Sequence, residues 1–303
     1  MADLIDTWDD VPKALEPVAP MTGPFPTEPF LEAWRRHRIA SDVEAPIAVS
    51  AAAAVPLWID QGVVRLSGEA DLTDYHSPLG DSLDECMAMV ARQYSGLGFS
   101  FDSLPIEAAR PLASALAAAD VPSASRPHGA ALVIDLPTDH KAWLGSLPKK
   151  RRHELRRKRR RFAESLGEPL LERRTDLEAF DAFITMHRSS QHDKGQFMTE
   201  AMERFFWTLI TDAGAAVDLL SVAGTPVATA FDFIDADALY LYNSSYAEDA
   251  SDASPGIALL ALMIERSIDD GLRRFDFLKG DEQYKYRLGA IDRPLTVLHG
   301  RFP

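Results

Sequence analysis

The chain of 303 residues is long enough for two domains of ~150 residues, and its composition, 46% hydrophobic and 26% charged, is that of an ordinary globular protein. No apolar run reaches the ~18 residues of a membrane span, and the acidic N-terminus lacks the basic and apolar regions of a secretory signal. The single cysteine, Cys86, excludes a disulfide framework and a cysteine-based metal site. We therefore expect a soluble, cytoplasmic protein.

The charge is divided unevenly along the chain. The formal net charge is −14, yet residues 149–161 contain ten Lys or Arg and one acidic residue. The remainder of the chain contains 22 basic and 45 acidic residues and should repel phosphate polymers. We therefore expect no DNA partner, although the basic segment 149–161 could bind an anion locally.

The first half alternates strand and helix patterns. Residues 1–27, rich in Pro and acidic residues, predict an irregular segment. The next segments predict a helix from Thr27 or Pro29, strands at 54–60 and 63–69, a helix at 83–94, a strand at 99–104, a helix at 110–120 and a strand at 129–136. This alternation is typical of an α/β fold.

The second half begins with helices. Residues 139–167 predict one or two helices with Asp139 as N-cap, followed by amphipathic helices at 176–195 and 199–214. Two turns divide 217–246 into three strands of an antiparallel meander. A helix at 254–271, a strand at 273–280, a short helix at 281–289 and a strand at 294–302 complete the chain. The predicted organisation is an irregular segment at 1–27, a domain at 28–138, a basic connecting helix at 139–167 and a second domain at 168–303.

This order of elements predicts a crossover. The helix at 256–270 would connect strand 239–246 to strand 274–278 and make the two strands parallel. The helix would then present free N–H groups at the sheet edge, where anions bind, and Gly256 would allow close backbone approach. The alternative for Ser254-Pro255-Gly256 is a plain helix start.

The layout and several short sequences resemble a known family. The run FDFLKGDEQYKYRLGA, with MHRSSQHDKG and SPGIALL upstream, resembles the CelD-like (cellulose-biosynthesis-type) acetyltransferases of the acyl-CoA N-acyltransferase (GNAT) superfamily, best over residues 126–298. These proteins are similar to Fem-type aminoacyl-transferases in having two GNAT-like halves. The resemblance implies two tandem GNAT-like domains, each a mixed, mostly antiparallel sheet flanked by helices.

The resemblance also implies a donor site for acetyl-CoA or another acyl-CoA. The pyrophosphate would lie on the helix start, and the thioester would lie along the end of the preceding strand. The implied cofactor-binding residues are Tyr242, Asn243, Ser244, Ser245, Ser254, Pro255, Gly256, Ile257 and Ala258. The chain departs from the family's Arg/Gln-x-x-Gly-x-Gly/Ala signature, because Ala253 stands where Arg or Gln belongs and Asp249 and Asp252 lie nearby. Basic residues from elsewhere, or another donor, would have to compensate.

Acyl transfer to an amine requires a base and stabilisation of the departing thiolate. The predicted catalytic residues follow the last crossover strand: Asp276, Glu282, Tyr284 and Lys285. Glu282 or Asp232 would act as base through water, and Tyr284 would donate a proton or position the acceptor. The alternative to a catalytic role is that the short helix at 281–289 is solvated and forms surface ion pairs only. For Asp232, the alternative is a side chain that faces solvent.

The acceptor would be held by residues outside this group. We predict that His187, Arg188, Asp232, Arg156, Arg159 and Arg287 bind substrate. His187 and His192 are five residues apart and have no cysteine partners, so we expect no metal site there.

Three interpretations of the basic run stay open. Leu147, Leu155, Phe162 and Leu166 form one narrow apolar stripe, which predicts a helix docked along one edge and solvated elsewhere. Such a helix could have a structural role only, bind the phosphates of CoA or of an acidic substrate, or bind tRNA. The leading hypothesis is an acyl-CoA-dependent N-acyltransferase that transfers an acetyl or similar group to an amine of a small molecule or sugar. The alternatives are a Fem-type aminoacyl-tRNA-dependent transferase and a non-catalytic accessory protein of polysaccharide assembly.

Overall fold

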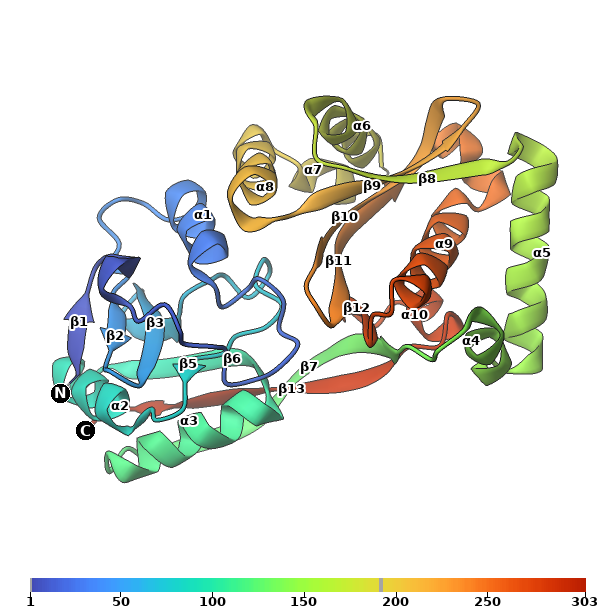
Figure 1. The fold of residues 1–303 in the computed structure, drawn as a ribbon. Helices are drawn as coiled ribbons and strands as arrows, with labels where there is room; N and C mark the ends of the chain where they lie inside the picture. The colour runs from blue at the N-terminus through green and yellow to red at the C-terminus, as the bar shows by residue number, and fades with distance from the viewer. Residues whose placement is uncertain (1, 191–192) are drawn as a thin grey trace. The chain divides into compact units, whose positions relative to one another are not determined.

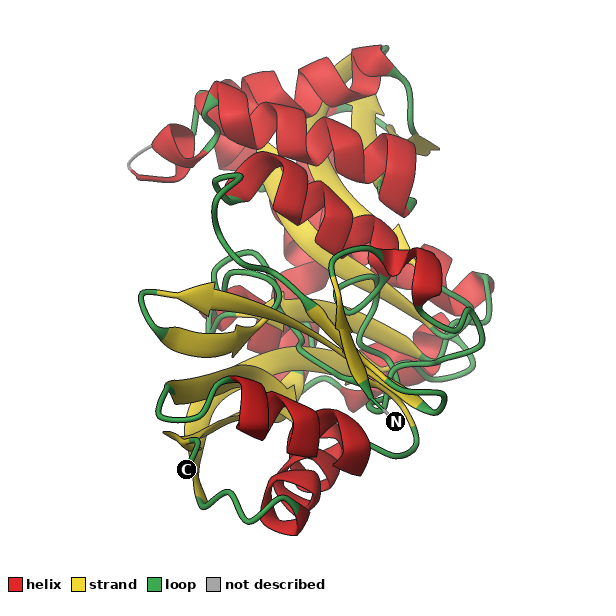
Figure 2. Ribbon diagram, turned by 90° about the vertical axis from the view of Figure 1, so that its left-hand side faces the viewer, coloured by secondary structure: helices red, strands yellow, loops and turns green. Residues whose placement is uncertain are grey.

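The computed structural model describes residues 2–190 and 193–303 and divides the chain into two compact units (Figure 1). Unit 1 contains Met1–Ala130 and Arg293–Pro303, and unit 2 contains Ala131–Asp292. In each unit, helices pack against the strands of a mixed sheet (Figure 2). The predicted mixed α/β fold is therefore confirmed.

Unit 1 contains a mixed sheet in the order β1-β2-β3-β4-β6-β13, with β5 beside β3. Its elements are β1 (Asp3–Ile5), a 3₁₀ turn (Trp8–Asp10), α1 (Glu28–Arg38), β2 (Ile47–Val49), β3 (Ala53–Asp60), β4 (Val63–Leu66), β5 (Leu79–Gly80), α2 (Asp84–Gln93), β6 (Gly98–Pro105), α3 (Ile106–Ala118) and the parts of β7 (Ser123–Asp135) and β13 (Ile291–Arg301) that belong to this unit. Strands β4 and β6 are parallel and are connected through α2.

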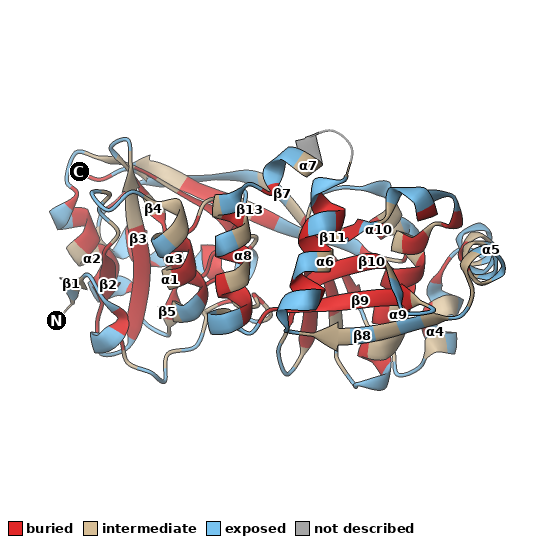
Figure 3. Ribbon diagram, turned by 90° about the horizontal axis from the view of Figure 1, so that it is seen from above, coloured by how far each residue is buried: buried red, intermediate tan, exposed pale blue. Residues whose placement is uncertain are grey.

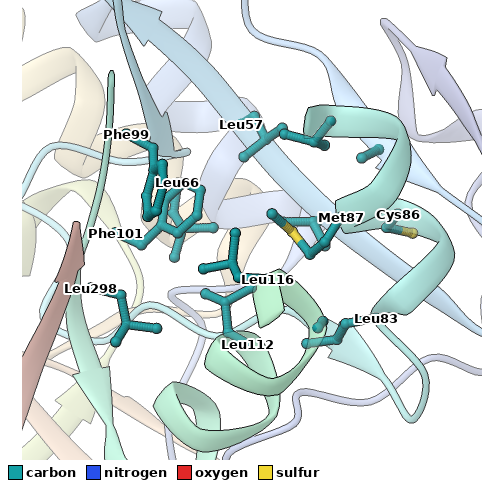
Figure 4. Packing of buried hydrophobic residues seen from close by; sticks show 14 of the residues in the cluster. Leu57, Leu66, Leu83, Cys86, Met87, Phe99, Phe101, Leu112, Leu116 and Leu298 are labelled. Atoms are coloured by element: carbon teal, nitrogen blue, oxygen red, sulfur yellow. The ribbon is translucent and has the colours of Figure 1, made fainter. Parts of the chain in front are cut away.

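The core of unit 1 lies between the sheet and the helices α2 and α3. Met87 of α2, Leu112 and Leu116 of α3, and Phe99 and Phe101 of β6 are fully or almost fully buried in one cluster (Figure 4). The lone thiol of Cys86 belongs to this cluster, and burial raises its pKa. It is therefore a packing residue rather than a reactive thiolate.

Within unit 2, the strands of the mixed sheet follow the order β7-β12-β11-β10-β9-β8. Its elements are the end of β7, α4 (His140–Ser146), α5 (Lys149–Leu166), β8 (Pro169–Arg174), α6 (Leu177–Arg188), α7 (Asp193–Phe197), α8 (Glu200–Ala213), β9 (Ala216–Val222), β10 (Thr225–Ile234), β11 (Ala238–Tyr246), a 3₁₀ helix η2 (Glu248–Ala253), α9 (Pro255–Asp269), β12 (Arg274–Lys279), α10 (Gln283–Arg287) and the start of β13. The antiparallel meander of β9, β10 and β11 and the parallel pairing of β11 with β12 through α9 confirm the predicted crossover.

The two faces of this sheet are covered by different helices (Figure 3). Ala230 and Leu239 face α9 and α5 and belong to their aliphatic cluster. Phe231 and Tyr242 face the other way and form ring contacts with Phe206 of α8. Successive strand residues point to opposite faces, so alternation along β10 builds both layers.

The unit boundaries differ from the predicted domains. The basic helix α5 is not a separate connector, because Leu155 and Phe162 are buried in the core of unit 2. The last strand does not belong wholly to the second domain, because Leu295–Arg301 pairs with β6 of unit 1. Residues 1–27 are also less irregular than expected, since β1 pairs with β2.

Candidate functional site

A pocket opens where β11 and β12 separate. The parallel pairing covers three residue pairs and ends at Tyr240 and Asp276, although β11 continues to Tyr246. The register between β10 and β11 also shifts, so that Tyr242 is an extra residue without a partner in β10. The pocket has a volume of about 340 Å³ and is lined by Lys158, Ser244, Ser245, Tyr246, Ser251, Ser254, Pro255, Gly256, Ile257, Leu260, Glu282 and Tyr284.

The first turn of α9 forms one wall. Ser254 adopts the left-handed conformation (φ 58°) before Pro255, and no side chain caps the helix. A Cβ added to Gly256 would lie 3.3 Å from the ring of Tyr246. Glycine therefore keeps the space between the helix start and this ring open, and the N–H groups and dipole of α9 favour an anion there.

Lys158 brings a cation from α5 to the same pocket. It lies three residues after Leu155 and four before Phe162, which places it on the face of α5 that packs into unit 2. The neighbouring Arg159 forms a bidentate ion pair with Glu265 of α9 and fixes the two helices together. The side chain of Lys158 is half-buried, so its charge is less screened than that of an exposed lysine.

The turn after β12 supplies the opposite wall. The Asp276 carboxylate accepts the N–H of Leu278 (2.8 Å), which holds Leu278 at φ 59°. The buried Lys285 ammonium donates to the carbonyl of Lys279 (2.8 Å) and pairs with the Glu282 carboxylate (2.8 Å). These contacts fix Glu282 at the pocket, where 54% of its side chain is exposed.

Gly280 is required in this turn. Its φ is +112°, and an added Cβ would lie 2.5 Å from the Glu282 carboxylate and 3.0 Å from the Lys285 ammonium. Any larger residue would therefore displace the ion pair that positions Glu282.

Tyr284 places a phenol in the pocket lining. Burial, and to a lesser extent the Glu282 carboxylate, raises the pKa of its phenol above the usual value. Its ring contacts Phe277 edge-on, with centroids 6.3 Å apart. The phenol therefore keeps its proton at neutral pH and can donate a hydrogen bond into the pocket.

The structure brings together eight of the predicted site residues: Ser244, Ser245, Ser254, Pro255, Gly256, Ile257, Glu282 and Tyr284. Others support them without lining the pocket. Asp276 and Lys285 hold the turn, and Ala258 of α9 is buried in the core of unit 2. Tyr242 stacks on Phe206, and the adjacent Asn243 lies at the shift in register.

The residues predicted to bind substrate lie elsewhere. His187 is buried between Phe183 and Phe197, with ring centroids 5.8 Å from each. Arg188 donates to the carbonyl of Met198 (3.0 Å) and pairs with Glu203, which connects α6 to α8. Arg156 and Arg287 are exposed, and Arg159 is engaged by Glu265.

Asp232 belongs to a buried ionic cluster between the sheet and α9. It pairs with Arg173, and the neighbouring Asp218 pairs with Arg266 (Nη1 to Oδ1, 2.6 Å). Burial, followed by the Asp218 carboxylate, raises the pKa of Asp232 well above its usual value, although Arg173 acts in the opposite direction. Arg266 lies ten residues beyond Gly256 on α9, about 15 Å along the helix, so this cluster is remote from the pocket.

Across the described part of the chain, no group of three or more His, Cys, Asp or Glu is arranged to hold a metal ion. His192, considered with His187 as a metal pair, lies outside the described residues. Nor is any helix within 2–190 or 193–303 long and apolar enough to cross a membrane.

Sequence reasoning missed four residues of the pocket: Lys158, Ser251, Tyr246 and Leu260. A signal for Lys158 was present, because it shares a helix face with Leu155 and Phe162 whereas Arg156 does not. The other three depend on the path of η2 and on the separation of β11 from β12, which residue spacing does not encode.

Comparison with known proteins identifies the domain that contains the pocket. Residues 149–286 match the family model described as an acetyltransferase (GNAT) domain. The match runs from α5 to α10 and includes every element that lines the pocket. Residues 149–286 are therefore a GNAT-type acetyltransferase domain, and the protein is an acyltransferase. No curated protein matches the sequence significantly.

Solved structures share the fold across both units. A conserved Bacteroides thetaiotaomicron protein of unknown function is 13% identical, with a TM-score of 0.62 and 92% of each chain covered. The C-terminal DUF2156 domain of an Agrobacterium fabrum protein is 14% identical, with a TM-score of 0.57 and 89% of this chain and 91% of that chain covered. FemX is 10% identical, with a TM-score of 0.56 and coverages of 89% and 90%. At these identities the likeness shows the fold alone.

Proposed function

We propose that the protein transfers an acetyl or similar acyl group from acyl-CoA to an amine of a small molecule or sugar. The observation that carries the proposal is the pocket between the separated strands, because it places the start of α9, a cation and a protonated phenol around one space. Membership of the CelD-like family and a cytoplasmic location remain predictions from the sequence.

The lining residues fit the chemistry of an acyl-CoA. The first turn of α9 and Lys158 would hold the pyrophosphate, with Lys158 replacing the Arg or Gln that is absent at Ala253. The gap beside Ser244 and Ser245 would hold the pantetheine arm and thioester. The edge of β11 beyond Leu241 is not paired with β12, so its backbone groups are available to a ligand.

The proposed reaction forms a C–N bond and breaks the C–S bond of the thioester. Glu282, through a water molecule, would accept the proton that the attacking amine loses. The Tyr284 hydroxyl would donate a proton to the departing thiolate, which suits a phenol that is protonated at neutral pH. Lys285 would act only by positioning Glu282, because its ammonium is buried and already engaged.

The proposal can be tested by titrating acetyl-CoA against Gly256→Val. The added side chain would fill the space between α9 and Tyr246, so binding should be lost. Gly145→Val is a matched control, because a Cβ at this helical glycine meets no atom within 4 Å. Equal binding by the wild type and Gly256→Val would refute the assigned site.

A second candidate, aminoacyl transfer from charged tRNA, is favoured by one observation. Helix α5 exposes many cations beside the pocket, as an RNA-binding surface would. Tight, salt-dependent binding of aminoacyl-tRNA without any binding of acetyl-CoA would support this candidate and exclude the first.

A further inference from the structure

The outward surface of α5 is a basic ridge that the proposed acyl transfer does not explain. Figure 3 shows α5 coloured largely as exposed. The exposed basic residues of the helix are Lys149, Lys150, Arg151, His153, Arg156, Arg157, Arg160 and Arg161. Among the described residues, Lys149, Lys150, Arg156, Arg160 and Arg161 form no ion pair. The helix has 18 residues and extends for about 27 Å.

This charge pattern does not stabilise the helix. The first turn of α5 contains no acidic residue and begins with Lys149 and Lys150, which oppose the helix dipole. Like charges one turn apart, such as Arg156 and Arg160, add repulsion. The burial of Leu155 and Phe162 holds the helix in place despite these costs, so the exposed charge points to a partner.

The ridge is continuous with the pocket. Lys158 lines the pocket from the same helix, and Arg151, two turns before it, donates to the carbonyl of Tyr286 in α10. A partner that lies on the ridge therefore sits beside the space in which the acyl group would react.

The pocket itself has little capacity for phosphate. Lys158 is the one basic residue among the described residues that line it. Asp249 and Asp252 of η2 are exposed just before the first turn of α9 and would repel additional phosphates. With one lysine in the lining and two aspartates nearby, the pocket has enough positive charge to bind one phosphate but not to neutralise all three phosphates of CoA.

We infer that the acyl donor is delivered by a small acidic carrier protein that docks on the ridge and inserts a phosphopantetheine thioester into the pocket. The inference rests on the proposed acyl transfer and names its partner. The same bonds change: the thioester C–S bond breaks, the amide C–N bond forms, and Tyr284 protonates the sulfur, which stays on the carrier as a thiol. Acyl-CoA carries the same phosphopantetheine thioester without the carrier protein, so it would act as a weaker donor.

An acidic protein fits the ridge better than a nucleic acid. The chain outside residues 149–161 contains 45 acidic and 22 basic residues, so a long phosphate polymer would meet repulsion beyond the ends of α5. A small globular partner can confine its contacts to one helix. Charge pairing across such a surface controls encounter and orientation and weakens with salt.

Binding tests the inference without knowledge of the acceptor. The probes are the acyl carrier protein of a bacterial fatty-acid synthase with an acetylated phosphopantetheine arm, the same protein without the arm, acetyl-CoA and total tRNA. The test variant is Lys149→Gln/Arg160→Gln, and the control Arg92→Gln/Arg110→Gln removes the same charge from exposed positions of unit 1. Circular dichroism confirms that both variants are folded.

We expect the acetylated carrier to bind at least tenfold more tightly than acetyl-CoA at low salt, and more tightly than the carrier without the arm. The α5 variant should weaken carrier binding about tenfold relative to acetyl-CoA binding, and the control should change neither affinity. Acetyl-CoA binding with no carrier binding would overturn the inference and leave the proposed function intact. Binding of tRNA in preference to the carrier would overturn it as well, and binding of neither thioester would also refute the proposed function.

Discussion

The substitution Lys158→Gln tests whether α5 supplies the cation that the sequence around Ala253 lacks. Lys158 is the basic side chain of the described pocket lining, and it is half-buried. Two unit charges about 4 Å apart interact by about 1 kcal/mol in water and about 4 kcal/mol at an effective dielectric constant of 20. A half-buried pair should lie between these limits, at about 2 kcal/mol.

This energy corresponds to a loss of about 30-fold in acetyl-CoA affinity. The assay is isothermal titration calorimetry at low salt, repeated in about 0.5 M NaCl, where screening should reduce the difference. Lys141→Gln in α4 is the control, because it removes an exposed lysine that lies outside the pocket lining. An affinity that is unchanged by Lys158→Gln would refute the idea that this lysine holds the pyrophosphate.

Three further predictions concern the pocket and its surroundings. Tyr284→Phe should lower kcat about 100-fold and leave acetyl-CoA affinity within about twofold, as measured by thiol release and calorimetry, because only the proton donor is lost. Lys285→Met should destabilise the protein by about 3 kcal/mol in urea unfolding, because it leaves the Glu282 carboxylate and a carbonyl without their buried donor. The raised pKa of Asp232 means that its contribution to stability is present at low pH and is lost as pH rises through that value. Asp232→Asn should therefore make unfolding by urea less dependent on pH above about pH 4, the ordinary pKa of an aspartate.

Each of these predictions has a control and a contrary result. Tyr286→Phe removes a phenol that bonds to Asp292 outside the pocket lining, and kcat should be retained; an equal loss in both tyrosine variants would contradict the donor role. Arg287→Met removes an exposed cation from α10 and should have little effect on stability, so an equal loss would contradict the anchoring role of Lys285. A variant Asp232→Asn with the pH dependence of the wild type would show that another group is responsible.

The sequence predicts the order of elements in unit 2 well, because turns and helix caps are local signals. Asp139 caps α4 through the N–H of Ala142 (2.7 Å), and Gly214 ends α8 in the left-handed conformation, as expected. Strand β8 was not predicted, because Pro169–Arg174 alternates between exposed and half-buried residues at the sheet edge without a strong apolar pattern. The last strand was predicted at 294–302, close to β13, but its pairing with β6 was not, since this pairing connects residues about 200 positions apart.

The parts of the candidate site that are formed by backbone could be predicted from the sequence. The start of α9 and the turn after β12 could be located from Gly256 and Gly280, because glycine is required where a side chain would clash. Asp232 was harder to interpret, because an aspartate within a strand can face solvent, a cleft or an arginine. Its contact with Arg173 arises because β8 pairs with β9, which in turn pairs with β10. Buried ion pairs depend on distant partners that spacing in one segment does not reveal.

The most direct test of acyl transfer at this pocket is calorimetric titration of the full chain with acetyl-CoA, with aminoacyl-tRNA as the competing ligand. The proposed function predicts one acetyl-CoA site per chain, and this site should be lost in Gly256→Val and retained in Gly145→Val. The absence of heat up to millimolar acetyl-CoA, together with binding of aminoacyl-tRNA, would contradict it.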